Sequence, residues 1–270
     1  MHLGQSAVSA AIAALEARHG AKLFHRAGRG VALTQAGQML LEAARGILAQ
    51  TAAAELMLAE LAGGRRGTLK LQASQTIASY WLPRYLAAFR QALPEVALEL
   101  TIGNTAQVAE AVLQGKAELG FIEGEIEAAS LLVDEIARDR MLIVVGPEHP
   151  WADQQIAPAA VLAGDWVLRE PGSGTRSVFE QAVLGFGFDP HSLRVALELP
   201  SNEAVRAAVE AGLGATALSA SVAAPSLETG LLRQVFLPLP DRGFYAIRHA
   251  ERYLSRAAEQ FMQDVVRVLR

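Results

Sequence analysis

Residues 67–122, GTLKLQASQTIASYWLPRYLAAFRQALPEVALELTIGNTAQVAEAVLQGKAELGFI, alternate between strand-like and helix-like patterns, and this alternation decides the fold. Thr68–Ser74 and Val96–Ile102 are expected to be strands, and each is followed by a segment that is expected to be a helix. Regular strand–helix alternation is typical of parallel or mixed sheets with helices on both faces. The pattern therefore predicts an α/β fold.

The alternation continues to the end of the chain. Further strands are expected at Leu119–Ile122, Met141–Val145, Trp166–Leu168, Leu193–Leu199, Ala215–Leu218, Leu232–Phe236 and Phe244–Arg248. Helices are expected at Ile77–Gln91, Thr105–Gln114, Arg176–Leu184, Asn202–Ala211 and Ser255–Leu269.

The first 66 residues follow a different pattern. Gln5–Arg18 is expected to be a helix that ends at Gly20. Two short apolar runs, 23–26 and 31–33, flank a basic glycine-rich turn and predict a hairpin, or wing. A long helix is then expected from Gln35 to Ala62, with Thr34 as its N-cap. The Gly63–Gly67 segment is the clearest linker in the chain.

The long helix carries a heptad-like seam, so we expect it to pair with a second copy of itself. The seam consists of Leu40, Ala44, Ile47, Thr51, Ala54, Leu58 and Leu61. It predicts a homodimer or a homotetramer.

Composition places the chain among ordinary globular proteins. Its 270 residues predict about two domains, and 51% hydrophobic against 19% charged residues allows a sizeable core. There is no cysteine, so disulfides and thiolate metal sites are excluded. The sequence shows neither a membrane-spanning segment nor a signal peptide, and a cytoplasmic protein is expected. Residues 1–66 hold seven Lys/Arg against four Glu, while the whole chain has a net charge of −4.

Several motifs together resemble the LysR-type transcription regulators across essentially the whole chain. At the start these are Gln5-Ser6-Ala7-Val8-Ser9, Leu23-Phe24 and Leu33-Thr34-Gln35-Ala36-Gly37. Later come Leu82-Pro83, Gly103-Asn104-Thr105, Gly120-Phe121-Ile122-Glu123 and Gly146-Pro147-Glu148-His149-Pro150. Residues 166–176 look like a branch of regulators of sulfur and carbon assimilation.

The resemblance implies three parts. Residues 1–34 would form a partial winged helix-turn-helix, and 35–66 a linker and dimerisation helix with a hinge. Residues 67–270 would form a two-lobed effector domain of the periplasmic-binding-protein type, with lobe I at 67–142 and 244–270 and lobe II at 143–243. A small anion would bind between the lobes, and hinge closure would reorient the paired DNA-binding heads.

For operator DNA, the resemblance points to Gln5, Ser6 and Ser9 near the start of the recognition helix and to Arg26 and Arg29 in the wing. From the residues alone, a helix cap and a solvated basic turn explain them as well. In this family roughly two dozen residues precede this motif and form the helix that supports recognition. We therefore expect impaired operator binding from this chain.

The predicted effector site combines loops from both lobes. Lobe I contributes the segment Ser74-Gln75-Thr76. Lobe II contributes Gly172-Ser173-Gly174-Thr175-Arg176 and Asn202. Glycines allow close backbone approach, helix starts offer free N–H groups, and arginine can bind an oxyanion in bidentate fashion. Sulfur oxyanions lead among the ligands by resemblance only, and simple helix caps remain the alternative.

No catalytic triad, metal-ligand spacing or cofactor motif is found, so neither enzymatic activity nor a cofactor is expected. The alternative function is a stand-alone two-lobed anion-binding protein that does not bind DNA.

Overall fold

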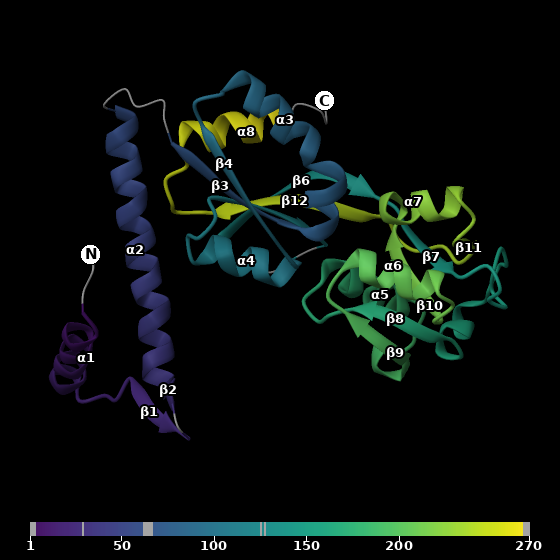
Figure 1. Cartoon of the computed structure of the whole chain (residues 1–270), viewed down its shortest axis with the longest axis horizontal. Coiled ribbons are helices and arrows are strands. Elements are labelled where there is room, and N and C mark those ends of the chain that lie inside the picture. Colours follow the sequence, from purple (N-terminus) through teal and green to yellow (C-terminus); the bar gives the residue numbers. More distant parts are fainter. Residues whose placement is uncertain (1–3, 29, 62–66, 125, 127, 267–270) are drawn as a thin grey trace. The chain divides into compact units, whose positions relative to one another are not determined.

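The computed structural model describes residues 4–28, 30–61, 67–124, 126 and 128–266. Arg29, most of the predicted linker and the last residues of the predicted C-terminal helix lie outside the described residues. The chain divides into two compact units, residues 1–55 and 56–270 (Figure 1).

The first unit confirms the predicted helix, hairpin and long helix. It contains α1 (Gln5–His19), β1 (Phe24–Ala27), β2 (Gly30–Leu33) and most of α2 (Gln35–Leu61), and β1 pairs with β2 antiparallel. Gly20 ends α1 with φ 64°, a conformation that glycine adopts without steric cost.

The side chains of Glu16 and Thr34 connect α1, the loop before β1 and α2 through hydrogen bonds. The Glu16 carboxylate on α1 accepts a hydrogen bond from the Leu23 N–H at 2.8 Å and pairs with Lys22 at 2.7 Å. Thr34 donates its hydroxyl to the Lys22 carbonyl and accepts from the Gly37 N–H at 3.0 Å, which caps α2. The loop before the hairpin is thus tied to both helices.

The α2 seam is largely uncovered in the single chain. Leu40, Ile47 and Leu58 are exposed, and Ile47 has 64% of its surface free. An apolar stripe of this kind at heptad spacing is typical of a helix that pairs with another helix.

The second unit contains two five-stranded sheets, each of which organises one lobe (Figure 1). Lobe I has the strand order β4-β3-β5-β12-β6, and lobe II has the order β11-β7-β10-β8-β9. The strands of lobe I are β3 (Thr68–Ser74), β4 (Ala97–Gly103), β5 (Leu119–Glu123), β6 (Leu131–Asp139) and β12 (Arg242–His249). Those of lobe II are β7 (Met141–Val145), β8 (Asp165–Arg169), β9 (Arg194–Leu199), β10 (Ala215–Ser219) and β11 (Arg233–Val235).

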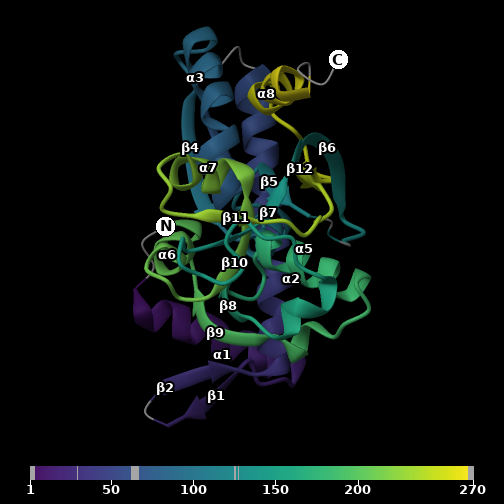
Figure 2. The same ribbon diagram turned by 90° about the vertical axis from the view of Figure 1, so that its right-hand side faces the viewer.

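Helices cover both faces of each sheet, as the alternation predicts. In lobe I, α3 (Pro83–Ala92) and α8 (Arg256–Val266) pack together on one face, and α4 (Thr105–Leu113) covers the other (Figures 1 and 2). In lobe II, α5 (Gly174–Gly185) covers one face, and α6 (Asn202–Glu210) with α7 (Ala220–Glu228) covers the other. Among the described residues, no helix is both long and apolar enough to cross a bilayer.

The chain passes between the lobes twice, once at Arg140 and once between β11 and β12. Met141 and Leu142 therefore belong to the sheet of lobe II, and Arg242 and Gly243 to that of lobe I. Each crossing lies two residues earlier than the expected boundary. At the crossings, Asp139 at the end of β6 is paired with Arg242 at the start of β12.

Some elements differ from the prediction. The expected helix 77–91 is divided into a π-helical turn, Ile77–Trp81, and α3, because Pro83 lacks an N–H and occupies the first turn of α3. β6 and α7 are absent from the prediction. β6 is an edge strand whose residues 132–135 are exposed, and α7 contains Pro225.

Candidate functional site

The loops that we predicted to form the effector site meet where the two lobes contact each other. Ser74 lies at the carboxyl end of β3, and the Gly172–Thr175 segment leads from β8 into α5. Ligands of α/β sheets bind outside the carboxyl ends of the strands, where the helices begin. We refer to the residues at this contact as the interlobe site.

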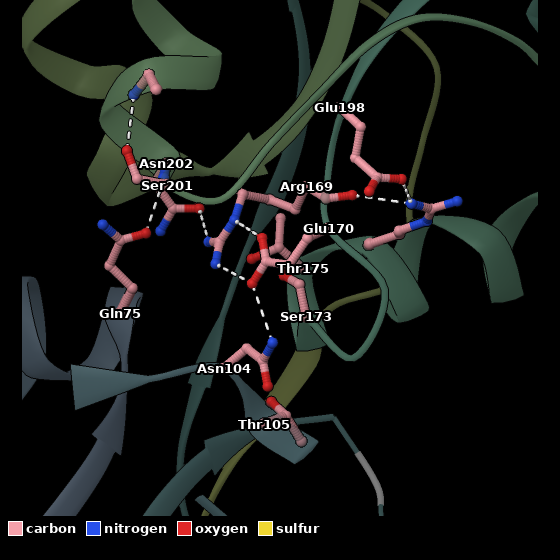
Figure 3. A network of polar contacts seen from close by, with 12 residues as sticks. Gln75, Asn104, Thr105, Arg169, Glu170, Ser173, Thr175, Glu198, Ser201 and Asn202 are labelled. Atoms are coloured by element: carbon pink, nitrogen blue, oxygen red, sulfur yellow. Dashed lines mark hydrogen bonds and ion pairs between the residues drawn. The ribbon is translucent and has the colours of Figure 1, made fainter. Parts of the chain in front are cut away.

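A first group of bonds joins the start of α6 to the loop after β3 (Figure 3). The Asn202 side-chain amide donates to the Thr76 hydroxyl at 3.0 Å, and the Asn202 backbone N–H donates to Gln75 Oε1 at 2.8 Å. Gln75 Nε2 in turn donates to the Glu203 carboxylate at 2.6 Å. Asn202 is fully buried. The structure thus brings Gln75, Thr76 and Asn202 together.

A second group, missed by the sequence analysis, runs through Arg169 and Glu170 (Figure 3). The Arg169 guanidinium donates to Asn202 Oδ1 at 2.6 Å and to both Glu170 oxygens at 2.8 and 3.0 Å. Asn104 of lobe I donates its amide to Glu170 at 3.1 Å. Burial acts to raise the pKa of Glu170, but the hydrogen bonds from Arg169 and Asn104 outweigh it and lower that pKa.

Arg242 is the second missed arginine and contacts both lobes. Its guanidinium donates to the Thr175 hydroxyl at 2.9 Å and, over a longer 3.4 Å, to the Thr76 hydroxyl. The same guanidinium forms an ion pair with Asp139 at 2.7 Å, and Ser219 donates to the other Asp139 oxygen at 2.9 Å. Arg242 and Asp139 are both buried. This pair lies where the two crossing strands leave lobe I.

The start of α5 fits tightly against lobe I. The Ala106 N–H donates to the Gly172 carbonyl at 3.1 Å, and Gly172 has φ 86°, which favours glycine. A Cβ atom on Gly174 would lie 2.4 Å from the Glu123 carbonyl oxygen. Ser173 is the N-cap residue but makes no side-chain capping bond. The first N–H groups of α5 therefore lack the partner that a capping side chain supplies.

Hydroxyl protons are available at this site. Within the described part of the chain, Ser74 Oγ is buried and has no hydrogen-bond partner. Thr76 Oγ1 accepts from Asn202 and Arg242, and Thr175 Oγ1 accepts from Arg242, so neither hydroxyl proton has an acceptor among the residues that the structure describes.

Arg176 does not join this cluster. Its guanidinium pairs with Glu180 at 2.7 Å and with Glu198 at 2.5 Å, and it donates to the Arg169 carbonyl at 3.0 Å. Both carboxylates belong to lobe II, so Arg176 is held on its own lobe, whereas Arg242 donates to Thr175 and Thr76 of the interlobe site. Glu180 lies four residues after Arg176 on α5, a spacing that brings the two side chains together.

The residues predicted to contact DNA lie in the first unit. Gln5, Ser6 and Ser9 are exposed on α1 and share one face of the helix at this spacing, and Arg26 is exposed on β1. Arg29 lies outside the described residues. Across the part of the chain that the structure describes, no group of three or more His, Asp or Glu residues could hold a metal ion.

Both units match known families. Residues 62–270 match the LysR substrate binding domain, and residues 1–38 match the bacterial regulatory helix-turn-helix protein of the lysR family. The chain is 34% identical to the uncharacterized HTH-type transcriptional regulator YeiE of Escherichia coli K12, over 96% of this chain and 87% of that protein. It is also 34% identical to a probable RuBisCO transcriptional regulator of Cyanidioschyzon merolae, over 99% of this chain and 90% of the relative.

Solved structures share the fold. The Synechocystis PCC6803 CcmR regulatory domain, in complex with 2-PG, has a TM-score of 0.67 and 24% identity over 75% of this chain and 97% of its own. CbnR, a LysR family transcriptional regulator, has a TM-score of 0.68 and 23% identity over 100% of this chain and 91% of its own. The family matches over both units, together with relatives at 34% identity, show that the chain belongs to the LysR family of bacterial transcriptional regulators.

Proposed function

We propose that this regulator binds operator DNA as a homodimer or homotetramer in the cytoplasm and responds to a small anion held between its lobes. It has no catalytic role in this proposal, because the interlobe site offers hydrogen-bond donors rather than a nucleophile beside a base.

The free hydroxyl protons carry the effector proposal. Ser74, Thr76 and Thr175 each have a buried hydroxyl whose proton has no acceptor among the described residues, and Arg242 orients two of these hydroxyls. Buried donors normally have partners, so an acceptor-rich ligand is the natural complement of such a cluster. The start of α5, which has no side-chain cap, adds N–H groups and a favourable dipole for negative charge.

The binding free energy of a micromolar effector requires contributions from both lobes. A helix end contributes about 0.3–1 kcal/mol, and up to about 2 when partly buried. A hydrogen bond to a charged group adds roughly 1.5–3 kcal/mol. Micromolar affinity needs about 8 kcal/mol net. Ser74 and Thr76 from lobe I, with Thr175 and the start of α5 from lobe II, could together supply it.

Two solved structures of similar fold hold small ligands, and these indicate the size of the effector that we propose. The CcmR regulatory domain was solved with 2-PG, and the effector binding domain of QuiR with shikimate. Shikimate is a small carboxylate, so an anion of similar size suits donors placed on two lobes. Sulfate and sulfite are also candidate effectors, because residues 166–176 resemble a branch of the family that includes regulators of sulfur assimilation.

Calorimetry of the full chain with sulfate, sulfite, shikimate and 2-PG tests this proposal. We expect at least one of them to bind, and Thr76→Val to weaken that binding about ten-fold or more, since it removes a hydroxyl donor to a charged group. Thr101→Val is the matched control, because Thr101 is exposed on β4. Affinity that Thr76→Val leaves unchanged, or no binding of any of the four anions, would contradict the proposal.

DNA contact is assigned to the first unit. Gln5, Ser6 and Ser9 present amide and hydroxyl groups on one face of α1, as readout of base edges and phosphates requires. Arg26 on the hairpin adds a positive charge for the phosphate backbone. The match of residues 1–38 to the lysR helix-turn-helix family disfavours the alternative of a stand-alone binding protein.

The exposed seam of α2 supports the proposed self-association. Ile47→Lys is expected to weaken the dimer about ten-fold or more, because it would bury an unpaired charge between two helices. Ala52→Lys is the matched control, since Ala52 is exposed and faces away from the seam at about 100° per residue. Light scattering over a dilution series measures both. If the two variants dissociate alike, the seam does not form the interface.

A further inference from the structure

One carboxylate of the chain itself is bound by donors from both lobes. Glu170 directly follows β8 of lobe II, and its two oxygens accept hydrogen bonds from the Arg169 guanidinium at 2.8 and 3.0 Å. One of these oxygens also accepts from the Asn104 side-chain amide of lobe I at 3.1 Å (Figure 3). A guanidinium that makes two parallel hydrogen bonds is the usual protein partner of a carboxylate ligand. The chain therefore already holds an acid group where its lobes meet.

Other contacts fix the two donors of this carboxylate. Asn104 Oδ1 accepts from the Gln107 N–H at 3.0 Å, so the amide nitrogen of Asn104 points toward Glu170. The third nitrogen of Arg169 donates to Asn202 Oδ1 at 2.6 Å. Both donor side chains are buried, and Arg169 has only 5% of its side chain exposed. We therefore expect the donors to stay in place if the Glu170 carboxylate leaves them.

Glu170 is more accessible than the two donors that hold it. Its side chain is 22% exposed, and it lies in the loop between β8 and α5 rather than in a strand or a helix. A carboxylate at the edge of the solvent regains water when it leaves its partners. We expect the exchange of Glu170 for another carboxylate to cost little, because the donors keep the same type of partner.

This carboxylate lies next to the hydroxyls of the interlobe site. Asn202 connects the two groups, because its Oδ1 accepts from Arg169 and its Nδ2 donates to the Thr76 hydroxyl at 3.0 Å. A small ligand whose acid group lies on Arg169 could therefore extend toward these hydroxyls with its other polar groups.

We propose that Glu170 is an internal substitute for the acid group of the effector, and that an effector carboxylate binds by displacing it from Arg169 and Asn104. This inference rests on the proposed function and narrows it, because it names a carboxylate as the class of anion and Arg169 as its cation. Glu170 is then a competitor, and the apparent affinity falls by the fraction of chains in which the donors are free. If they are free in about a tenth of the chains, removing Glu170 raises the affinity about ten-fold.

Acetate is the probe for this subsite, and thermal unfolding followed by tryptophan fluorescence is the readout. Acetate should raise the melting temperature of the Glu170→Ala variant of the full chain by about 2 °C or more, because it binds the folded chain at the vacated guanidinium. We expect the unsubstituted chain to need about ten-fold more acetate for the same rise. Acetamide has the same shape without the charge, and at constant ionic strength it should affect neither chain. Adding Arg169→Met to Glu170→Ala should abolish the effect of acetate.

Glu198→Ala is the matched control. It removes a carboxylate of lobe II that also pairs with an arginine, Arg176, at 2.5 Å, but it leaves Arg169 and Glu170 in place. This variant should respond to acetate as the unsubstituted chain does. Glu170→Gln keeps the size of the side chain and serves if Glu170→Ala does not fold. It should also require less acetate than the unsubstituted chain, because a neutral amide competes less well for a guanidinium.

The inference is overturned if neither Glu170 variant responds at lower acetate concentrations than the unsubstituted chain, if acetamide is as effective, or if Glu198→Ala gains as much. The same holds if acetate still acts after Arg169→Met. A gain for acetate supports the exchange of Glu170 even if none of the four anions tested above binds. Anion binding that depends on Thr76, without a gain for acetate, leaves the proposed function in place and removes this inference.

Discussion

The Arg242→Met variant is expected to lose about 3–5 kcal/mol of unfolding free energy, because it leaves the buried Asp139 carboxylate without its cation. Asp139 has only 6% of its side chain exposed, and the ion pair lies at 2.7 Å. The substitution also removes the donors that Arg242 gives to Thr175 and Thr76. Urea unfolding followed by tryptophan fluorescence measures the loss, since Trp81, Trp151 and Trp166 all lie in the second unit.

Arg138→Met is the control for this prediction. Arg138 pairs with Glu135 at 2.8 Å, but its side chain is 71% exposed, and exposed pairs contribute only about 0–1 kcal/mol. Adding Asp139→Asn to Arg242→Met should recover part of the stability, because it removes the unpaired charge. Equal losses in Arg242→Met and Arg138→Met would mean that burial does not set the strength of the pair.

The local pattern of apolar and polar residues was sufficient to predict most of the strands and helices. The strands Thr68–Ser74 and Met141–Val145 agree residue for residue with the prediction, because the first begins with alternating polar and apolar residues and the second is a continuous apolar run. β6 escaped detection because its middle carries exposed charges. α7 escaped because Pro225 and several small residues obscure its helical pattern.

The sequence indicated those residues of the site that lie in loops between strands and helices. It did not indicate Arg242, which the pairing of two distant strands brings to the site. Ser74 ends a strand, and Thr76 and Thr175 lie at the starts of the helices that follow strands, so their position was readable from the sequence. Arg242 becomes part of the site only because β12 returns beside β6 and places it opposite Asp139, 103 residues earlier in the chain. No local signal marks that pairing. For Arg176 a signal existed, since Glu180 four residues later is a ready partner on the same helix.

Gly174 lies where the two lobes pack tightly against each other. It is the first residue of α5 in lobe II, and an added Cβ would lie 2.4 Å from the Glu123 carbonyl oxygen and 2.6 Å from the Thr105 hydroxyl, both in lobe I. One of these atoms is backbone at the end of a buried strand, so it cannot rotate away. We therefore expect the movement to come from the lobes themselves.

Gly174→Ala is expected to hold the lobes apart without unfolding either of them, and to weaken binding of the interlobe anion about ten-fold or more, since donors from both lobes can no longer reach one ligand. Hydrogen exchange gives a readout that needs no ligand. The Ala106 and Asn202 amides donate across the interlobe contact, to Gly172 and Gln75, and should lose protection, whereas amides inside β3 should keep it. Gly185→Ala is the matched control on the same helix, because nothing lies within 4 Å of its added Cβ, and it should leave both affinity and protection unchanged. Protection of both interlobe amides at the level of the unsubstituted chain would show that the contact yields locally and that Gly174 does not control closure.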